Sequence, residues 1–267
     1  MKHYKRVLTI AGSDSGGCAG IQADLKTASA CGCFATSAIT ALTVQNTCGI
    51  RAVHIPPADI VAGQAEAVLE DIGTDAVKLG MLPTAEIVER VAGILRRFDV
   101  RNIVLDPVMV ATSGDELIPA EAARAIVRHL LPLASIITPN VPEAAYITGS
   151  EIASEADFPM AAARLRELGA RSVLLKAGHL ENRTLRDYLY DGDRVYTYSY
   201  ERTETPNTHG TGCTLSSAIA SFLAQGHPLP EAVARAEEYI HKAIRCGAEY
   251  RLGHGHGPVH HFFRFWE

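Results

Sequence analysis

The stretch Asn207-Thr208-His209-Gly210-Thr211-Gly212-Cys213-Thr214 joins a polar, turn-rich segment to an apolar run with helical spacing at 215–223. Its two glycines allow the backbone to turn tightly and to approach a ligand closely. The first N–H groups of the following helix have no internal partner, and with the helix dipole they attract anions. Cys213 falls in the first turn, where the same field favours the thiolate. The stretch predicts an anion pocket with a candidate base, although an ordinary glycine-rich helix start has the same pattern.

Composition narrows the classes of protein that this stretch can belong to. The chain has 267 residues, of which 47% are hydrophobic and 21% charged, as in a globular protein with a large core. A net charge of -5 argues against a general nucleic-acid binder. The chain has no stretch of membrane-spanning length and no export signal, so we expect a cytoplasmic protein with six reduced cysteines. Cys31 and Cys33 are spaced as metal ligands, but no second pair completes a site.

Short apolar segments alternate with longer segments of helical periodicity. We predict strands at 7–10, 38–44, 76–79, 102–105, 135–138 and 172–175. We predict helices at 21–30, 58–69, 84–98, 120–131, 142–147, 156–168 and 230–248, besides the one after Gly212. This alternation is typical of an α/β domain with a mostly parallel sheet covered on both faces. Asp191-Gly192 between the runs 185–190 and 195–200 predicts a hairpin and thus a small antiparallel edge. No linker is evident, so we expect one domain over residues 1–267.

Polar or glycine residues follow each predicted strand, where ligands bind in open α/β sheets. They are Gly12 in the glycine-rich loop 12–20, Gln45 after Val44, Met81 after Gly80, Asp106 before Val108 and Met109, Asn140 with Glu143, and Lys176. Taken singly, the glycines can be plain turns, the amide a loop contact and the aspartate a loop cap. Asn140 and Glu143 offer the hard oxygen ligands that suit magnesium, and Lys176 can pair with phosphate. The combination with the anion pocket matches phosphoryl transfer, which needs charge neutralisation, positioning and a base.

These residues also stand in motifs that resemble a known family. The carrying segments are 9–14, 20–27, 39–46, 78–82, 106–109, 138–140, 207–214 and 255–262, which run in order over almost the whole chain. They are similar to the hydroxymethylpyrimidine and phosphomethylpyrimidine kinases of the ribokinase-like superfamily. The resemblance implies a three-layer ribokinase-like fold and ATP-dependent phosphorylation of 4-amino-5-hydroxymethyl-2-methylpyrimidine, then of its monophosphate, in thiamine diphosphate biosynthesis. It further implies Mg2+ and a homodimer.

The resemblance also implies residue roles. The substrate side would comprise Gly12, Asp24, Val44, Gln45, Met81, Asp106, Val108 and Met109, with Gln45 pairing to the aminopyrimidine edge. The nucleotide side would comprise Asn140, Glu143, Lys176, Thr208, Gly210 and Gly212, with Asp106 and Glu143 on the metal. Catalysis would fall to Gly210, Thr211, Gly212, Lys176 and Cys213, whose thiolate would accept the substrate hydroxyl proton.

Three positions depart from the pattern of the relatives, and two other functions stay open. Cys18 takes the place of a small residue, Ala177 stands after Lys176 where the relatives usually carry glycine, and Glu237 falls where the relatives often carry lysine. A pyridoxal kinase of the same superfamily is one alternative, alone or as a second activity. A catalytically silent protein that senses the pyrimidine is the other, and it would be favoured if the polar strand-end residues were missing.

Overall fold

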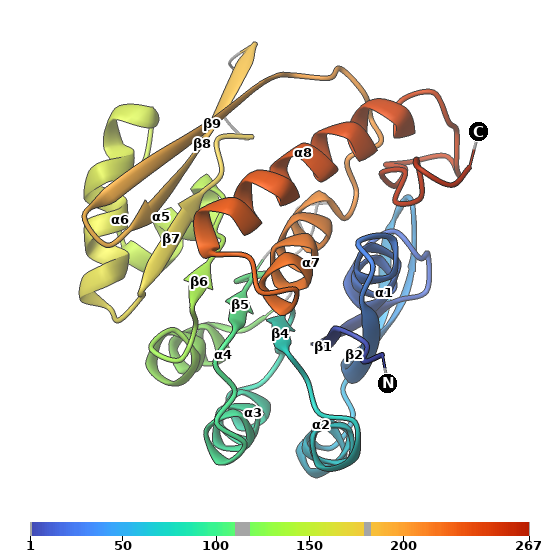
Figure 1. Cartoon of the computed structure of the whole chain (residues 1–267), viewed down its shortest axis with the longest axis vertical. Coiled ribbons are helices and arrows are strands. Elements are labelled where there is room, and N and C mark those ends of the chain that lie inside the picture. Colours follow the sequence, from blue (N-terminus) through green and yellow to red (C-terminus); the bar gives the residue numbers. More distant parts are fainter. Residues whose placement is uncertain (1, 110–117, 179–182, 267) are drawn as a thin grey trace.

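A nine-stranded sheet forms the centre of the part of the chain that the structure describes, which is residues 2–109, 118–178 and 183–266 of a computed structural model (Figure 1). Its order is β3-β2-β1-β4-β5-β6-β7-β8-β9. The strands are β1 (Arg6–Asp14), β2 (Phe34–Asn46), β3 (Gly49–His54), β4 (Ala76–Leu79), β5 (Ile103–Leu105), β6 (Ile136–Ile137), β7 (Ser172–Leu175), β8 (Thr184–Asp191) and β9 (Arg194–Glu201). In this spatial order, the six strands β2, β1, β4, β5, β6 and β7 pair in parallel with one another. At the two edges, β3 pairs antiparallel with β2, and β8 and β9 follow β7 in antiparallel pairs. The predicted ribokinase-like sheet with an antiparallel edge is confirmed, and β3 adds a second such edge.

Helices cover both faces of this sheet, as the alternating pattern predicts (Figure 1). They are α1 (Gly20–Ala30), α2 (Ala58–Asp71), α3 (Ala85–Arg97), α4 (Ala120–Ala125), α5 (Val141–Thr148), α6 (Phe158–Glu167), α7 (Thr211–Ala224) and α8 (Leu229–Gly247). The single helix expected at 120–131 is instead α4 followed by a π-helical turn, Ile126–Leu130. None of the helices within the described ranges is long and apolar enough to cross a membrane.

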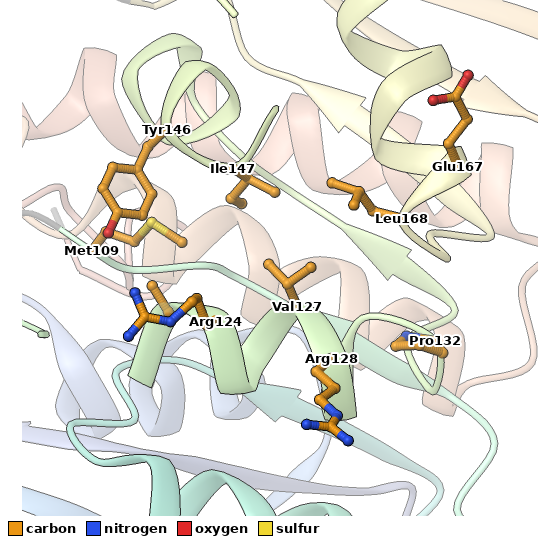
Figure 2. Close-up of a pocket in the computed structure, with 10 residues that line it drawn as sticks. Met109, Arg124, Val127, Arg128, Pro132, Tyr146, Ile147, Glu167 and Leu168 are labelled. Carbon is orange, nitrogen blue, oxygen red and sulfur yellow. The ribbon is translucent and has the colours of Figure 1, made fainter. Parts of the chain in front are cut away.

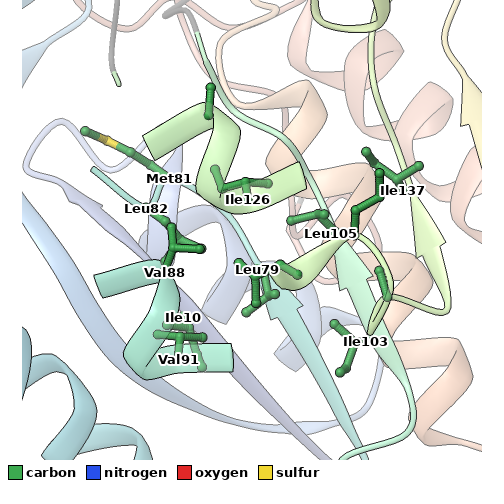
Figure 3. Packing of buried hydrophobic residues seen from close by; sticks show 14 of the residues in the cluster. Ile10, Leu79, Met81, Leu82, Val88, Val91, Ile103, Leu105, Ile126 and Ile137 are labelled. Carbon is green, nitrogen blue, oxygen red and sulfur yellow. The ribbon is translucent and has the colours of Figure 1, made fainter. Parts of the chain in front are cut away.

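Two hydrophobic clusters hold the layers together, one on each face of the sheet. Because strand side chains alternate between faces, Val7 packs with α1, α7 and α8, whereas Leu8 and Ile10 pack with α2 to α6. Figure 3 shows Ile10, Leu79, Leu105 and Ile137 from four adjacent strands beneath the helices of the second cluster. The alternation of side chains between the two buried faces fixes the register of the strands. Because the central strands are parallel, their carboxyl ends lie along one rim of the sheet.

A buried ion pair connects the first of these clusters to the sheet. Lys78 of β4 is fully buried, and its Nζ lies 2.9 Å from Asp24 Oδ1 of α1. Asp24 also accepts hydrogen bonds from Thr9 Oγ1 of β1 at 2.5 Å and from Ser217 Oγ of α7 at 2.6 Å. Burial opposes the charge of Lys78, but the negative charges of Asp24 and Asp106 outweigh it and raise its pKa. The ammonium therefore stays charged and ties α1 and α7 to β1 and β4.

Removing one partner of this pair should destabilise the protein strongly. Asp24→Asn should lower the free energy of unfolding in urea by about 3–5 kcal/mol, because the Lys78 ammonium would stay buried without its counter-charge. Glu167→Gln is the matched control, since its partner Arg164 is 55% exposed. It should change the same free energy by less than about 1 kcal/mol. Equal small effects in both variants would mean that Asp24 does not neutralise Lys78.

Candidate active site

The strand-end residues gather where the chain changes direction across the sheet. From β1 the chain first builds β2 and β3 on one side and later β4 to β9 on the other, so the switch lies between β1 and β4. Open α/β sheets bind ligands at such a point. The helix α7 packs against β1, β4 and β5, and its first residue is Thr211. Its N–H groups therefore open onto the rim, as the sequence predicts.

The two glycine-rich loops touch each other at this place. Gly210 precedes α7 with φ +84°, and a Cβ on it would lie 1.9 Å from the carbonyl oxygen of Cys18. Gly20 begins α1 with φ +57°, and a Cβ there would lie 2.3 Å from the carbonyl oxygen of Gly12. Neither position has room for a side chain, and both backbones have the left-handed conformation that glycine adopts without strain. The glycines are therefore requirements of a close loop contact and not plain turns.

Asp14 holds the first loop in shape. Its carboxylate accepts N–H bonds from Gly16 at 2.7 Å, Cys18 at 3.0 Å and Ala19 at 2.9 Å. Its Oδ2 also lies 3.4 Å from His209 Nε2 in the second loop. Burial alone would raise the pKa of Asp14, but His209 and the N–H groups of Ala19 and Gly16 hold it below its usual value. The carboxylate thus stays charged while it is enclosed by both loops.

His209 links this arrangement to the predicted substrate residue Gln45. Gln45 Nε2 lies 3.0 Å from His209 Nε2, and Thr43 Oγ1 lies 3.0 Å from Gln45 Oε1. Neither Asp14 nor His209 was among the residues expected in the site. His209 lies inside the stretch 207–214, so the sequence points to its region, but nothing in the sequence shows that it pairs with Gln45, 164 residues away.

Cys213 lies partly exposed in the first turn of α7, as expected, but its thiol is not acidic. Burial raises the pKa of Cys213 to about 11; Lys78 opposes this shift, and the negative charges of Asp24 and Asp106 add to it. The expectation that the helix start alone would favour the thiolate is therefore wrong for the free protein. Burial of the thiol is the main reason, and the nearby carboxylates of Asp24 and Asp106, which no local sequence pattern reveals, add to it.

Asp106 and Lys176 face each other beside this helix start. Lys176 Nζ lies 3.5 Å from Asp106 Oδ1, and the same carboxylate accepts bonds from Thr138 and Ser216 hydroxyls, each at 3.2 Å. A Cβ on Gly212 would lie 3.5 Å from Lys176 Nζ and 3.6 Å from Asp106 Oδ2. The structure thus brings together the helix start, a carboxylate and an ammonium, which the sequence predicts separately.

Glu143 and Asn140 form the far side of this group. Asn140 Oδ1 accepts the N–H of Glu143, and Glu143 Oε2 accepts the N–H of Asn140, each at 2.9 Å, which is a capping box at the start of α5. Burial raises the pKa of Glu143 to about 7, with Lys176 opposing the shift and Asp106 adding to it. Glu143 is therefore a carboxyl group that a nearby cation would readily ionise.

Among the residues expected on the substrate side, some come together and some do not. Gly12 and Met81 meet, since a Cβ on Gly12 would lie 3.3 Å from Met81 Sδ. Val44 is 56% exposed on β2 and, among the described residues, is not enclosed. Val108 is partly buried against the core. On the expected nucleotide side, the Thr208 carbonyl accepts the N–H of Thr211 at 3.3 Å.

Two of the residues expected on the substrate side, Asp24 and Met109, are buried. Asp24 is 1% exposed with its oxygens bonded to Thr9, Lys78 and Ser217, so it lies beneath the site as a counter-charge and not on its surface. Met109 is buried, its backbone N–H bonds to the Glu143 carboxylate, and its side chain lines a cavity of about 470 Å³ with Arg124 and Tyr146 (Figure 2). Its place on the substrate side stays a prediction. The directions of both side chains depend on partners that a sequence pattern does not show.

Comparisons with known proteins agree with this arrangement. A family model described as phosphomethylpyrimidine kinase matches residues 14–260. A hydroxymethylpyrimidine/phosphomethylpyrimidine kinase of Rhizobium meliloti is 51% identical over 97% of this chain and 98% of its own length. A thiamine biosynthesis bifunctional protein, ThiED, of Geobacter sulfurreducens is 51% identical over 96% of this chain and 52% of its own length. The crystal structure of an ADP complex of Bacillus subtilis pyridoxal kinase has a TM-score of 0.91 at 37% identity, covering 98% of this chain and 100% of its own.

The raised pKa of Glu143 predicts a pH dependence of stability. Its ordinary pKa is 4.5 and its folded pKa is about 7, so its contribution is fully present below pH 4.5 and is lost as pH rises through 7. Between pH 5 and pH 8 the wild type should lose on the order of 2 kcal/mol more unfolding free energy than Glu143→Gln. Glutamine keeps an oxygen for the capping box, so the variant is a fair comparison. Parallel curves for the two proteins in urea unfolding would contradict this assignment.

Proposed function

Because the chain belongs to the phosphomethylpyrimidine kinase family, we infer that it is an ATP-dependent hydroxymethylpyrimidine/phosphomethylpyrimidine kinase of thiamine biosynthesis. It phosphorylates 4-amino-5-hydroxymethyl-2-methylpyrimidine and then the monophosphate, giving the diphosphate. One observation carries the inference beyond the family match. The start of α7, Asp106 and Lys176 lie together at the ends of the parallel strands, where a transferring phosphoryl group requires them.

We assign the start of α7 to the phosphate that is transferred. Gly210 and Gly212 present backbone N–H groups at the positive end of a 14-residue helix, whereas the N–H of Thr211 between them is bonded to the Thr208 carbonyl at 3.3 Å. The absence of a side chain on Gly212 leaves this end open towards Lys176. Each such donor is typically worth about 10²–10³-fold in rate. Lys176 adds a positive charge that neutralises phosphate oxygens during transfer.

Cys213 is assigned as the group that receives the proton of the substrate hydroxyl. The thiol lies in the first turn of α7, which we assign to the phosphate, so we expect it beside the attacking oxygen. Burial favours the thiol, as do the charges of Asp24 and Asp106, and only Lys78 favours the thiolate, so Cys213 can accept the hydroxyl proton only after its own proton has left to solvent. A positioned base typically contributes roughly 10²–10⁴-fold.

A magnesium ion fits the opposite side of the group. Asp106 and Glu143 offer carboxylate oxygens of the kind that Mg2+ prefers, and the buried Glu143 has a pKa of about 7 that a cation would lower. Mg2+, when bound, neutralises phosphate charge on the nucleotide. Lys176 would hold Asp106 in place, and the Asn140 cap would fix Glu143. Thr208, next to the loop contact, completes the proposed nucleotide side.

We assign the pyrimidine to the region of Gly12, Met81 and Gln45. The bare α-carbon of Gly12 leaves room beside the thioether of Met81 for a flat ring. Gln45 can pair with the aminopyrimidine edge through its amide, which His209 already orients. A homodimer in the cytoplasm, as the resemblance implies, completes the proposal.

Pyridoxal kinase is the second candidate activity. The likeness to the pyridoxal kinase of Bacillus subtilis extends over 98% of this chain, and its substrate is also a hydroxymethyl heteroaromatic ring. The higher identity to the pyrimidine kinases favours the pyrimidine as the main substrate.

The assignment of Cys213 has a direct test in kinetics. Cys213→Ala should lower kcat for the pyrimidine by at least about a hundredfold, because the proton acceptor is lost, while pyrimidine affinity in calorimetry stays close to wild type. Cys246→Ala, which changes a cysteine on α8 outside the site, should keep wild-type turnover. Near-normal turnover in Cys213→Ala would refute the role of the thiol.

A further inference from the structure

A second cluster of metal-ligating side chains lies beside the proposed pyrimidine region. Asp14 at the end of β1, Cys18 in the first glycine-rich loop and His209 in the second each present a ligand atom, and these atoms all lie within 4.8 Å of one another. All three side chains are buried. The three residues are separated by as many as 195 positions in the chain, so the contact between the two loops is what brings them together.

The hydrogen-bond inventory around Asp14 leaves one direction for a cation. A carboxylate has about four lone-pair sites, and three of those on Asp14 accept backbone N–H groups. The remaining one is on Oδ1, because Oδ2 already accepts the N–H groups of both Cys18 and Ala19. A metal ion bound through Oδ1 would leave the loop's own hydrogen bonds intact, whereas one bound through Oδ2, which lies 3.4 Å from His209 Nε2, would replace one of them.

Gln45 adds a further acceptor to the same point. Thr43 Oγ1 has one proton and lies 2.9 Å from the carbonyl oxygen of Ser13 and 3.0 Å from Gln45 Oε1. Turning the Gln45 amide over lets its NH2 group donate to Thr43 and aims its carbonyl oxygen at His209 Nε2, 3.0 Å away. Oxygens of Asp14 and Gln45 then converge on one imidazole proton, with the Cys18 sulfur nearby.

A divalent cation satisfies such a set of lone pairs better than a single proton does. One sulfur, one imidazole nitrogen and one carboxylate oxygen form the kind of mixed donor set that binds Zn2+, and three protein ligands leave a fourth position open. We propose that Asp14, Cys18 and His209 bind a thiophilic divalent cation such as Zn2+. The S–H bond of Cys18 is replaced by a sulfur–metal bond and its proton is released to solvent, while the Nε2 proton of His209 is replaced by one on Nδ1, so that the neutral imidazole coordinates through Nε2.

Binding would cross-link the two glycine-rich loops. Cys18 precedes α1 and His209 precedes α7, so one ion would connect the starts of both helices. Because the three ligands lie together only in the folded chain, the ion would stabilise the native state. This inference does not depend on the kinase reaction, since the residues assigned to catalysis are not among the ligands.

The probe is Co2+, whose thiolate complexes absorb in the near ultraviolet. Titration of the reduced, full-length protein with Co2+ should produce a sulfur-to-metal charge-transfer band that saturates at about one ion per chain, and Zn2+ should abolish it. In Cys18→Ala the band should be lost. In Cys48→Ala, which changes an exposed cysteine, the band should remain as in the wild type.

A third variant separates this site from the nearby cysteine pair. Cys31→Ala should keep the band, since Cys31 and Cys33 lie outside the cluster. Absence of a band in the wild type, or an undiminished band in Cys18→Ala, would overturn the proposal. Cys18→Ser and the unfolding midpoint of each metal-free variant distinguish loss of the ligand from loss of the fold. Kinase turnover is not part of the readout, so a failure here leaves the proposed function untouched.

Discussion

The arrangement of the site depends on the contact between the carbonyl oxygen of Cys18 and the bare α-carbon of Gly210. A side chain at Gly210 would place its Cβ 1.9 Å from that oxygen, so α7 can start here only with glycine. The contact fixes the start of α7 against the loop after β1. Gly20 makes the same kind of contact with the carbonyl oxygen of Gly12, and this contact fixes the start of α1. Two helix starts are thereby held over the point where the sheet changes direction.

Buried charge of alternating sign extends from this point along the rim of the sheet. Asp24 and Lys78 lie beneath Cys213, and Asp106 and Lys176 lie beside it, with Glu143 next to Lys176. Each charge changes the ionisation of its neighbours because buried charges are weakly screened. Burial, together with these charges, raises the pKa of Cys213 to about 11 and that of Glu143 to about 7. A ligand that carries phosphate and a cation would therefore change the protonation of Cys213 and Glu143 when it binds.

Hydrophobic periodicity predicts the order of strands and helices, because burial on both faces of the sheet imposes it. The bounds of β4 and β7 agree with the prediction, and the hairpin at Asp191-Gly192 is confirmed. The sequence does not predict β3, because most of its side chains are exposed and no alternation of apolar residues marks it as a strand. The π-helical turn at Ile126–Leu130 likewise keeps a helical pattern and is invisible in sequence.

For the site, the sequence identifies which residue types stand at the strand ends, but not where their side chains point. Asp106, Lys176 and Gly212 come together as predicted. The side chain of Asp24 points inward, where it pairs with Lys78, 54 residues later. The pKa of Cys213 rises because the thiol is buried, and Asp24 and Asp106 nearby add to the shift. Such pairings join residues far apart in the chain, and only the folded structure decides them.

The central claim is that the rim around α7 transfers phosphate from ATP to the pyrimidine. The most direct measurement is ADP release in a coupled assay with hydroxymethylpyrimidine, its monophosphate and pyridoxal compared as acceptors at equal concentration. We expect both pyrimidines to give ATP-dependent turnover with kcat/KM above that for pyridoxal. Two results would contradict the account: ADP release with pyridoxal but with neither pyrimidine, or no ADP release with any of the three acceptors.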